Sequence, residues 1–126
     1  MAQKILLIEP DLFLQAIYRT ALERSGFDVV SVQTAQAAIF AAEKYKPDLV
    51  ILEVQLEGNS GIEFLHEFRS YIDWQQTPII MNTNLSLKSV NIKEDILENI
   101  GVARYCYKPN TNIGQLTDFA IETLGE

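Results

Sequence analysis

Short apolar runs alternate with helical patterns along this chain of 126 residues. The runs are as short and as continuous as strands that are covered on both faces. The segments between them carry apolar residues three and four positions apart, which places those residues on one face of a helix. Strands that alternate with helices pair in parallel, and the helices then cover both faces of one sheet. The alternation therefore predicts an α/β domain with a doubly wound, five-stranded parallel sheet.

The expected elements follow from the apolar runs and from local start and stop signals. Strands are predicted at residues 4–8, 27–32, 48–54, 78–81 and 102–107. Helices are predicted at 11–25, 34–45, about 90–100 and about 113–124, and another follows the turn at 57–61 and carries Ile62, Leu65 and Phe68 inward. Asp11 and Thr34 are the expected N-caps, and Gly26 and Gly101 are the expected stops. No linker or repeat divides the chain, so we expect residues 1–126 to form a single domain.

Composition excludes several classes of function. Seventeen acidic residues face ten basic ones, a net charge of −7 without a Lys/Arg cluster, which argues against a nucleic-acid or anionic-membrane surface. No apolar run approaches the roughly 20 residues that span a bilayer. Cys106 is the only cysteine and His66 the only histidine, so a structural zinc site and an internal disulfide are excluded. We expect a cytoplasmic protein.

Polar and charged residues directly follow four of the predicted strands. In open α/β sheets the functional cleft lies outside the carboxyl ends of the strands. The residues at those ends are Glu9, Pro10 and Asp11 after the first strand, Glu53 in the third, Asn82, Thr83 and Asn84 after the fourth, and Lys108 and Pro109 after the fifth. Carboxylates gathered with a lysine are a combination that can bind a divalent cation and orient a phosphoryl group.

These motifs and their order resemble a known family. The segments Lys-Ile-Leu-Leu-Ile-Glu-Pro-Asp, Lys-Pro-Asp-Leu-Val-Ile-Leu-Glu followed by Gly61, Pro-Ile-Ile-Met-Asn-Thr and Tyr-Cys-Tyr-Lys-Pro are similar to those of receiver domains of two-component response regulators. Glu9, Glu53, Thr83 and Lys108 stand 44, 30 and 25 residues apart in turn. The resemblance covers about residues 4–124 and implies a flavodoxin-like strand order, 2-1-3-4-5.

The resemblance also implies roles for individual residues. In the family an aspartate that ends the third strand accepts phosphate from a histidine kinase, and two acidic residues after the first strand hold Mg²⁺. By position Glu9 resembles the first of these acids, Thr83 the hydroxyl switch, Tyr105 the aromatic switch and Lys108 the lysine that contacts the phosphate. A cis peptide bond between Lys108 and Pro109 is implied as well.

Two positions depart from the family pattern. Glu53 stands where the family has its aspartate, and its extra methylene carries the nucleophilic oxygen past the position that in-line transfer requires, an error of about 1 Å that can cost ~10²-fold in rate. Pro10 stands where the second acid is expected and offers no side-chain oxygen. Asp11 either replaces that ligand or serves as the helix cap, so weak Mg²⁺ binding by Glu9, Asp11 and Glu53 is the most that we expect. Glu53 is expected either to form an ion pair with Lys108 or to approach Thr83.

We therefore expect a receiver-like signalling module that is not an enzyme and acts by protein–protein contact, without normal phosphorylation. The resemblance implies a histidine kinase, an output domain or another signalling protein as partner, at a face of about residues 90–124, and leaves a homodimer open. Two alternatives remain: a conventional phospho-accepting receiver, and a domain that binds a small molecule in the same cleft. No cofactor, nucleic acid or membrane is expected as a ligand.

Overall fold

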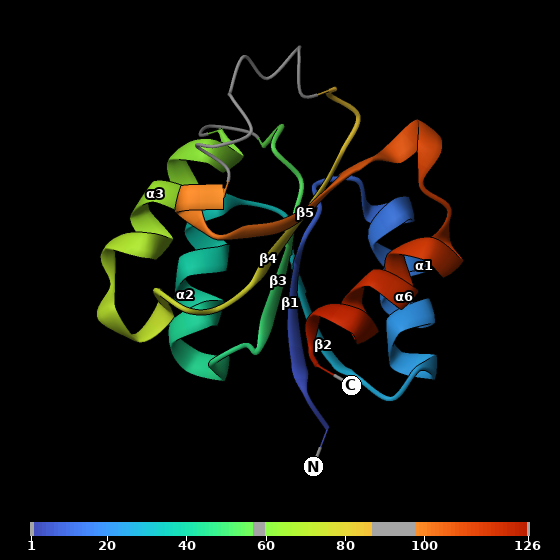
Figure 1. Ribbon diagram of the computed structural model, residues 1–126, viewed down its shortest axis with the longest axis horizontal. Coiled ribbons are helices and arrows are strands. Elements are labelled where there is room, and N and C mark those ends of the chain that lie inside the picture. The colour runs from blue at the N-terminus through green and yellow to red at the C-terminus, as the bar shows by residue number, and fades with distance from the viewer. Residues whose placement is uncertain (1, 57–59, 87–97, 126) are drawn as a thin grey trace.

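The computed structural model describes residues 2–56, 60–86 and 98–125, which fold around a five-stranded parallel sheet (Figure 1). The strands are β1 (Lys4–Ile8), β2 (Asp28–Val32), β3 (Leu49–Leu52), β4 (Ile79–Thr83) and β5 (Val102–Tyr107). Their order in the sheet is β2-β1-β3-β4-β5, which confirms the predicted topology. Because all neighbours pair in parallel, the carboxyl ends of the five strands share one edge.

Helices cover both faces of the sheet. Figure 1 shows α2 (Ala35–Tyr45) and α3 (Gly61–Ser70) on one face, with α1 (Leu12–Arg24) and α6 (Ile113–Thr123) on the other. Two short 3-10 helices that the sequence did not predict, η1 (Ile72–Trp74) and η2 (Lys108–Asn110), lie between larger elements. Within the described segments, none of the helices is long and apolar enough to cross a membrane.

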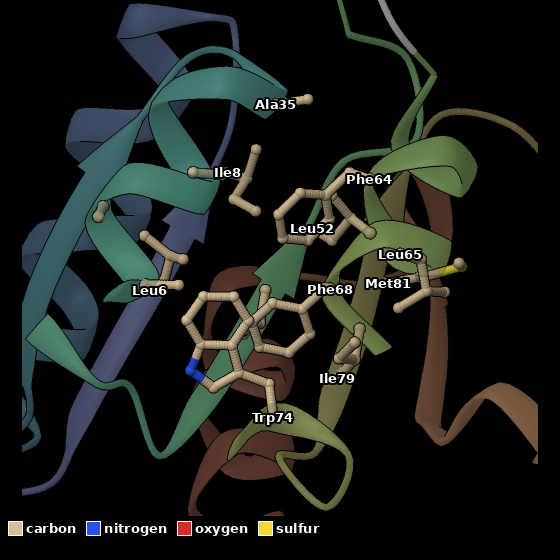
Figure 2. Close-up of a cluster of buried hydrophobic side chains, with 14 of the residues drawn as sticks. Leu6, Ile8, Ala35, Leu52, Phe64, Leu65, Phe68, Trp74, Ile79 and Met81 are labelled. Atoms are coloured by element: carbon tan, nitrogen blue, oxygen red, sulfur yellow. The ribbon is translucent and has the colours of Figure 1, made fainter. Parts of the chain in front are cut away.

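Two hydrophobic cores lie on the two sides of the sheet. The larger core lies under α2 and α3, where Figure 2 shows side chains from β1, β3 and β4 meeting the aromatic rings of α3. Phe64, Phe68 and Trp74 stack in a column there, with ring centroids 5.4 Å and 4.9 Å apart. The second core lies between the sheet and the pair α1 and α6. The central strands are buried on both faces, which is why they read as continuous apolar runs in the sequence.

The predicted helix ends are confirmed where the structure describes them. The Asp11 carboxylate accepts hydrogen bonds from the first backbone N–H groups of α1, and Thr34 caps α2 in the same manner. Gly101 has a φ of 90°, the left-handed conformation expected of a glycine that ends a helix. Most of the helix predicted at about 90–100 lies outside the described residues.

The implied cis bond at Lys108–Pro109 is wrong. The described residues contain no cis peptide bond. The chain turns here through η2, with the proline at the start of a 3-10 helix, where a fixed φ and a missing N–H are tolerated in the ordinary trans form.

Arg69 ties the end of α3 to two other segments. Its guanidinium donates hydrogen bonds to the carbonyl oxygens of Trp74, Ile100 and Gly101, the last at 3.0 Å. A Cβ atom on Gly101 would lie 2.6 Å from this guanidinium and would displace the Arg69 side chain, in addition to the strain that a φ of 90° places on any other residue. Partial burial lowers the pKa of Arg69.

Candidate functional site

Two buried carboxylates follow paired residues of neighbouring strands at the carboxyl edge of the sheet. Glu9 directly follows β1 and Glu53 directly follows β3, and these two strands are neighbours. The Glu9 N–H donates to the Val32 carbonyl and the Glu53 N–H donates to the Ile8 carbonyl, each at 3.0 Å, so the sheet ladder continues for one residue and fixes both backbones. Glu9 is 2% exposed and Glu53 is 3% exposed, so neither charge is solvated.

Lys108 bridges these two carboxylates. Its Nζ lies 2.6 Å from Oε1 of Glu9 and 2.7 Å from Oε1 of Glu53. The lysine side chain is only 8% exposed, and burial lowers its pKa, but the hydrogen bonds and charges of Glu53 and Glu9 outweigh burial and leave the pKa raised. The ammonium group is therefore held in its charged form. One cation between two anions leaves this three-residue cluster with a net charge of −1.

The other oxygen of each carboxylate accepts a backbone hydrogen bond. Oε2 of Glu9 accepts from the N–H of Asp11, and Oε2 of Glu53 accepts from the N–H of Gln55, both at 3.0 Å. All four carboxylate oxygens are thus bound to donors of the protein itself. The Asp11 side chain takes no part in the cluster, because its exposed carboxylate caps α1 at 2.9 Å and 3.1 Å from two helical N–H groups.

Thr83 and Tyr105, the two residues that resemble switches, meet at the backbone of Leu85. The Thr83 hydroxyl oxygen accepts from the Leu85 N–H at 3.2 Å, and the Tyr105 hydroxyl donates to the Leu85 carbonyl at 2.5 Å. Burial and, to a smaller degree, the charge of Glu53 raise the pKa of Tyr105 to about 12. Between the two expectations for Glu53, the structure therefore has the ion pair with Lys108, and Thr83 is fully buried beside a loop.

The structure also assigns supporting roles that the sequence did not indicate. The Gln15 side chain donates to the carbonyls of Glu9 and Val32, at 3.0 Å and 3.2 Å, and so joins α1 to the ends of β1 and β2. Gly61 packs against the residues after β3, where an added Cβ would lie 2.8 Å from the Glu53 carbonyl oxygen. The only available signal for Gln15 was its place one helical turn after the Asp11 cap.

The remaining reactive side chains lie apart from the cluster. His66 is exposed on α3, and Cys106 is buried within β5, where burial raises the pKa of its thiol. Among residues 2–56, 60–86 and 98–125, no three His, Cys, Asp or Glu side chains are grouped so that they could hold a metal ion. The candidate site of the described chain is therefore the cluster of Glu9, Glu53 and Lys108.

Comparisons with known proteins agree on the kind of domain. A family model described as "Response regulator receiver domain" matches residues 5–119. The chain is similar to the KDP operon transcriptional regulatory protein KdpE of Escherichia coli, with 33% identity over 89% of this chain and 47% of that protein. It is also similar to the alkaline phosphatase synthesis transcriptional regulatory protein PhoP of Bacillus subtilis, with 31% identity over 86% of this chain and 43% of that protein.

A solved structure has the same fold over almost the whole chain. It is a CheY-like response regulator receiver domain protein from Methanospirillum hungatei, with a TM-score of 0.85 and 23% identity over 98% of this chain and 94% of that chain. The chain spans less than half the length of the two regulators KdpE and PhoP that it matches.

Proposed function

This chain belongs to the family of response regulator receiver domains, and from that premise we propose that it is a receiver-like module that signals through protein contact and is not phosphorylated in the normal way. The observation that carries the proposal is the cluster in which Lys108 binds Glu9 and Glu53 at once. In this proposal Glu53 occupies the place of the phosphoacceptor, the cluster performs no catalysis, and the domain works in the cytoplasm.

The contacts of Glu53 support the loss of phosphate acceptance. Nucleophilic attack on a phosphoryl group needs a carboxylate oxygen that is free to approach in line. In this chain one oxygen of Glu53 binds Lys108 and the other binds the Gln55 N–H. A bound donor reduces the electron density that an attacking oxygen offers, and the additional methylene of glutamate moves that oxygen from where an aspartate would hold it.

The donors around Glu9 do not fit the magnesium site of the family. Mg²⁺ requires near-octahedral oxygen ligands and is usually held by one or two free carboxylates. The Glu9 oxygens are bound to Lys108 and to the Asp11 N–H, Pro10 has no side-chain oxygen, and the Asp11 carboxylate caps α1. We therefore propose that Mg²⁺ binds weakly if it binds at all, and that no step of the function depends on it.

The same contacts support a permanently held state. A carboxylate carries one negative charge, whereas a phosphoryl group carries about 1.5 to 2, so Glu53 imitates a phosphorylated residue only in part. The Glu53–Lys108 ion pair nevertheless exists without any added group. We propose that a partner protein, such as a histidine kinase or an output domain, reads this one state at the face of residues 90–124, whose described part holds β5 and α6. The same proposal includes two forms of contact at this face: binding to the output domain of a longer protein, and pairing of two copies of this chain as a homodimer.

Phosphorylation with acetyl phosphate and Mg²⁺, followed by intact mass, tests the proposal. We expect no gain of a phosphoryl mass for the natural chain, under conditions in which a receiver domain with aspartate at this place is modified. The variant Glu53→Asp separates the two defects, because it corrects the nucleophile alone. The double variant Pro10→Asp/Glu53→Asp also restores an acid after β1.

The outcomes are distinct. If only the double variant gains a phosphoryl group, the loss of phosphate acceptance is due to both Pro10 and Glu53. If the single variant Glu53→Asp gains it, the loss is due to the glutamate nucleophile. A stable gain in the natural chain that requires Mg²⁺ and disappears in Glu53→Gln would contradict the proposal and establish the conventional receiver instead. Binding of a small molecule in this cleft would be detected as a rise in melting temperature that Glu53→Ala abolishes.

A further inference from the structure

A separate pocket of about 350 Å³ lies at the amino ends of β3 and β4, the opposite edge of the sheet from Glu53. Its walls come from the end of α2 and from the segment that contains η1 and leads into β4; the lining residues are Glu43, Lys46, Pro47, Asp73, Trp74 and Thr77. The four residues of β3 separate it from the candidate site, a length of roughly 13 Å along the strand. Nothing in the proposed function uses this pocket.

Trp74 gives the pocket a buried hydrogen-bond donor. The residue is 8% exposed and stacks on Phe68 with centroids 4.9 Å apart and an interplanar angle of 9°. In Figure 2 the indole nitrogen lies on the side of the ring turned away from Phe68. The indole N–H donates to no residue in the described parts of the chain. Every described side-chain nitrogen that is sealed from solvent has a hydrogen-bond partner, so this nitrogen is not sealed. The N–H therefore reaches solvent, and because Trp74 lines the pocket, we infer that this donor is available there to an acceptor.

Charged side chains of both signs stand at the rim without partners. Glu43, Lys46 and Asp73 are exposed, and none of them forms an ion pair with another described residue. Two anions and one cation give the rim a net charge of −1. Lys46 is also the one described non-glycine residue with positive φ, 51°, a left-handed conformation at the C-cap of α2 that costs roughly 1 kcal/mol.

We propose that this pocket binds a basic amino acid, a ligand with one carboxylate and two cationic groups. The carboxylate would accept from the Trp74 N–H and face the Lys46 ammonium, and the two cationic groups would face Glu43 and Asp73. The net charge of +1 on such a ligand complements the rim. A simple anion would meet two carboxylates, and a simple cation would leave the indole N–H without an acceptor. The stacked indole and the buried Pro47 contact the aliphatic part of the ligand.

Fluorescence of Trp74, the only tryptophan of the chain, measures binding directly. The probes are L-arginine, L-lysine and L-ornithine, added to the full chain at constant ionic strength, with melting temperature as a second readout. Agmatine, which lacks the carboxylate, and citrulline, which lacks the side-chain charge, are the matched analogues. The variants Glu43→Gln and Asp73→Asn each remove one rim anion, and Asp28→Asn removes an exposed acid at the amino end of β2 as a control.

We expect at least one of the three amino acids to change the emission saturably and to raise the melting temperature. Loss of a hydrogen bond to a charged group reduces affinity about tenfold or more, and we expect losses of that size for agmatine, citrulline and both rim variants. Asp28→Asn should bind as the natural chain does. No saturable change with any of the three, or equal binding of agmatine or citrulline, or an equal loss in Asp28→Asn, would overturn the proposal. None of these outcomes depends on whether Glu53 accepts phosphate.

Discussion

Replacing Lys108 by methionine measures what a single ammonium group contributes to the cluster. Methionine keeps an unbranched side chain that is one atom shorter than lysine, and it removes the ammonium group with its charge and its hydrogen-bond donors. Each Oε1 atom of Glu9 and Glu53 lies within 2.7 Å of Nζ. The two oxygens are therefore within about 5 Å of each other, where two unit charges repel by about 3 kcal/mol at an effective dielectric constant near 20. Removal of one partner from a buried ion pair costs about 3–5 kcal/mol in measured cases, which agrees.

The loss has a ceiling that depends on pH. A variant without the lysine escapes the repulsion when one carboxyl group takes up a proton, which costs about 1.4 kcal/mol for each pH unit above the ordinary glutamate value near 4.3. The electrostatic loss is thus limited to about 4 kcal/mol at pH 7 and to about 1 kcal/mol at pH 5. We expect Lys108→Met to lose about 3 kcal/mol of unfolding free energy at pH 7 and no more than about 1 kcal/mol at pH 5.

Urea unfolding at pH 5, 6, 7 and 8, followed by tryptophan emission, tests this expectation. Lys44→Met removes an exposed lysine from α2 and should change the unfolding free energy by less than about 0.5 kcal/mol at every pH. The triple variant Glu9→Gln/Glu53→Gln/Lys108→Met carries no charge in the cluster, so the cluster itself should no longer contribute to the pH dependence of the unfolding free energy. A loss in Lys108→Met no greater than that in Lys44→Met, or an equal loss at pH 5 and pH 8, would refute the reasoning.

Three further predictions concern single side chains. Gly61→Ala should lower the unfolding free energy measured in urea by about 1–3 kcal/mol, because the new Cβ would lie 2.7 Å from a backbone atom after β3. The control Gly114→Ala, on α6, should be neutral or stabilising, because its Cβ would meet no atom closer than 3.4 Å. Asp11→Ala removes the α1 cap and should lower the unfolding free energy in urea by about 1 kcal/mol. The decline of the unfolding free energy at high pH should stay as it is in the natural chain. The folded chain keeps the Tyr105 proton up to about pH 12, whereas the unfolded chain loses it near pH 10. The protonated hydroxyl therefore contributes stability that is fully present below pH 10 and is lost as the pH rises through 12. Tyr105→Phe should flatten the decline of unfolding free energy between pH 9 and 11.5, and an unchanged decline would contradict the assignment.

The sheet could be predicted from sequence because its strands are buried on both faces. A run such as Leu49–Leu52 leaves no choice of an outward face, so its apolar character identifies a strand without knowledge of its neighbours. The position of η1 could not be predicted from apolar runs. Its three residues are too short for a periodic pattern, and Trp74 is held by contacts with Phe68 and Arg69 that no local signal encodes.

The site could be predicted in its membership and only partly in its contacts. Parallel pairing brings the residues after β1, β3 and β5 to one edge, so Glu9, Glu53 and Lys108 could be grouped from the sequence alone. That Lys108 divides its hydrogen bonds between both acids depends on side-chain directions across the sheet, and these do not follow from spacing. The role of Asp11 was decided by competition between a ligand position and a helix cap, and the cap prevails.

The three hydrogen bonds of Arg69 make distant pieces of the chain depend on one another. Because one guanidinium binds the backbone carbonyls of Trp74, Ile100 and Gly101, we expect a loosening of residues 100–101 before β5 to disturb the backbone at Trp74, 26 residues before Ile100 in the chain. The lone tryptophan is thus a natural reporter for motion at the start of β5. Amide protons in η1 and around Gly101 should exchange with solvent as one cooperative unit, at a common opening free energy.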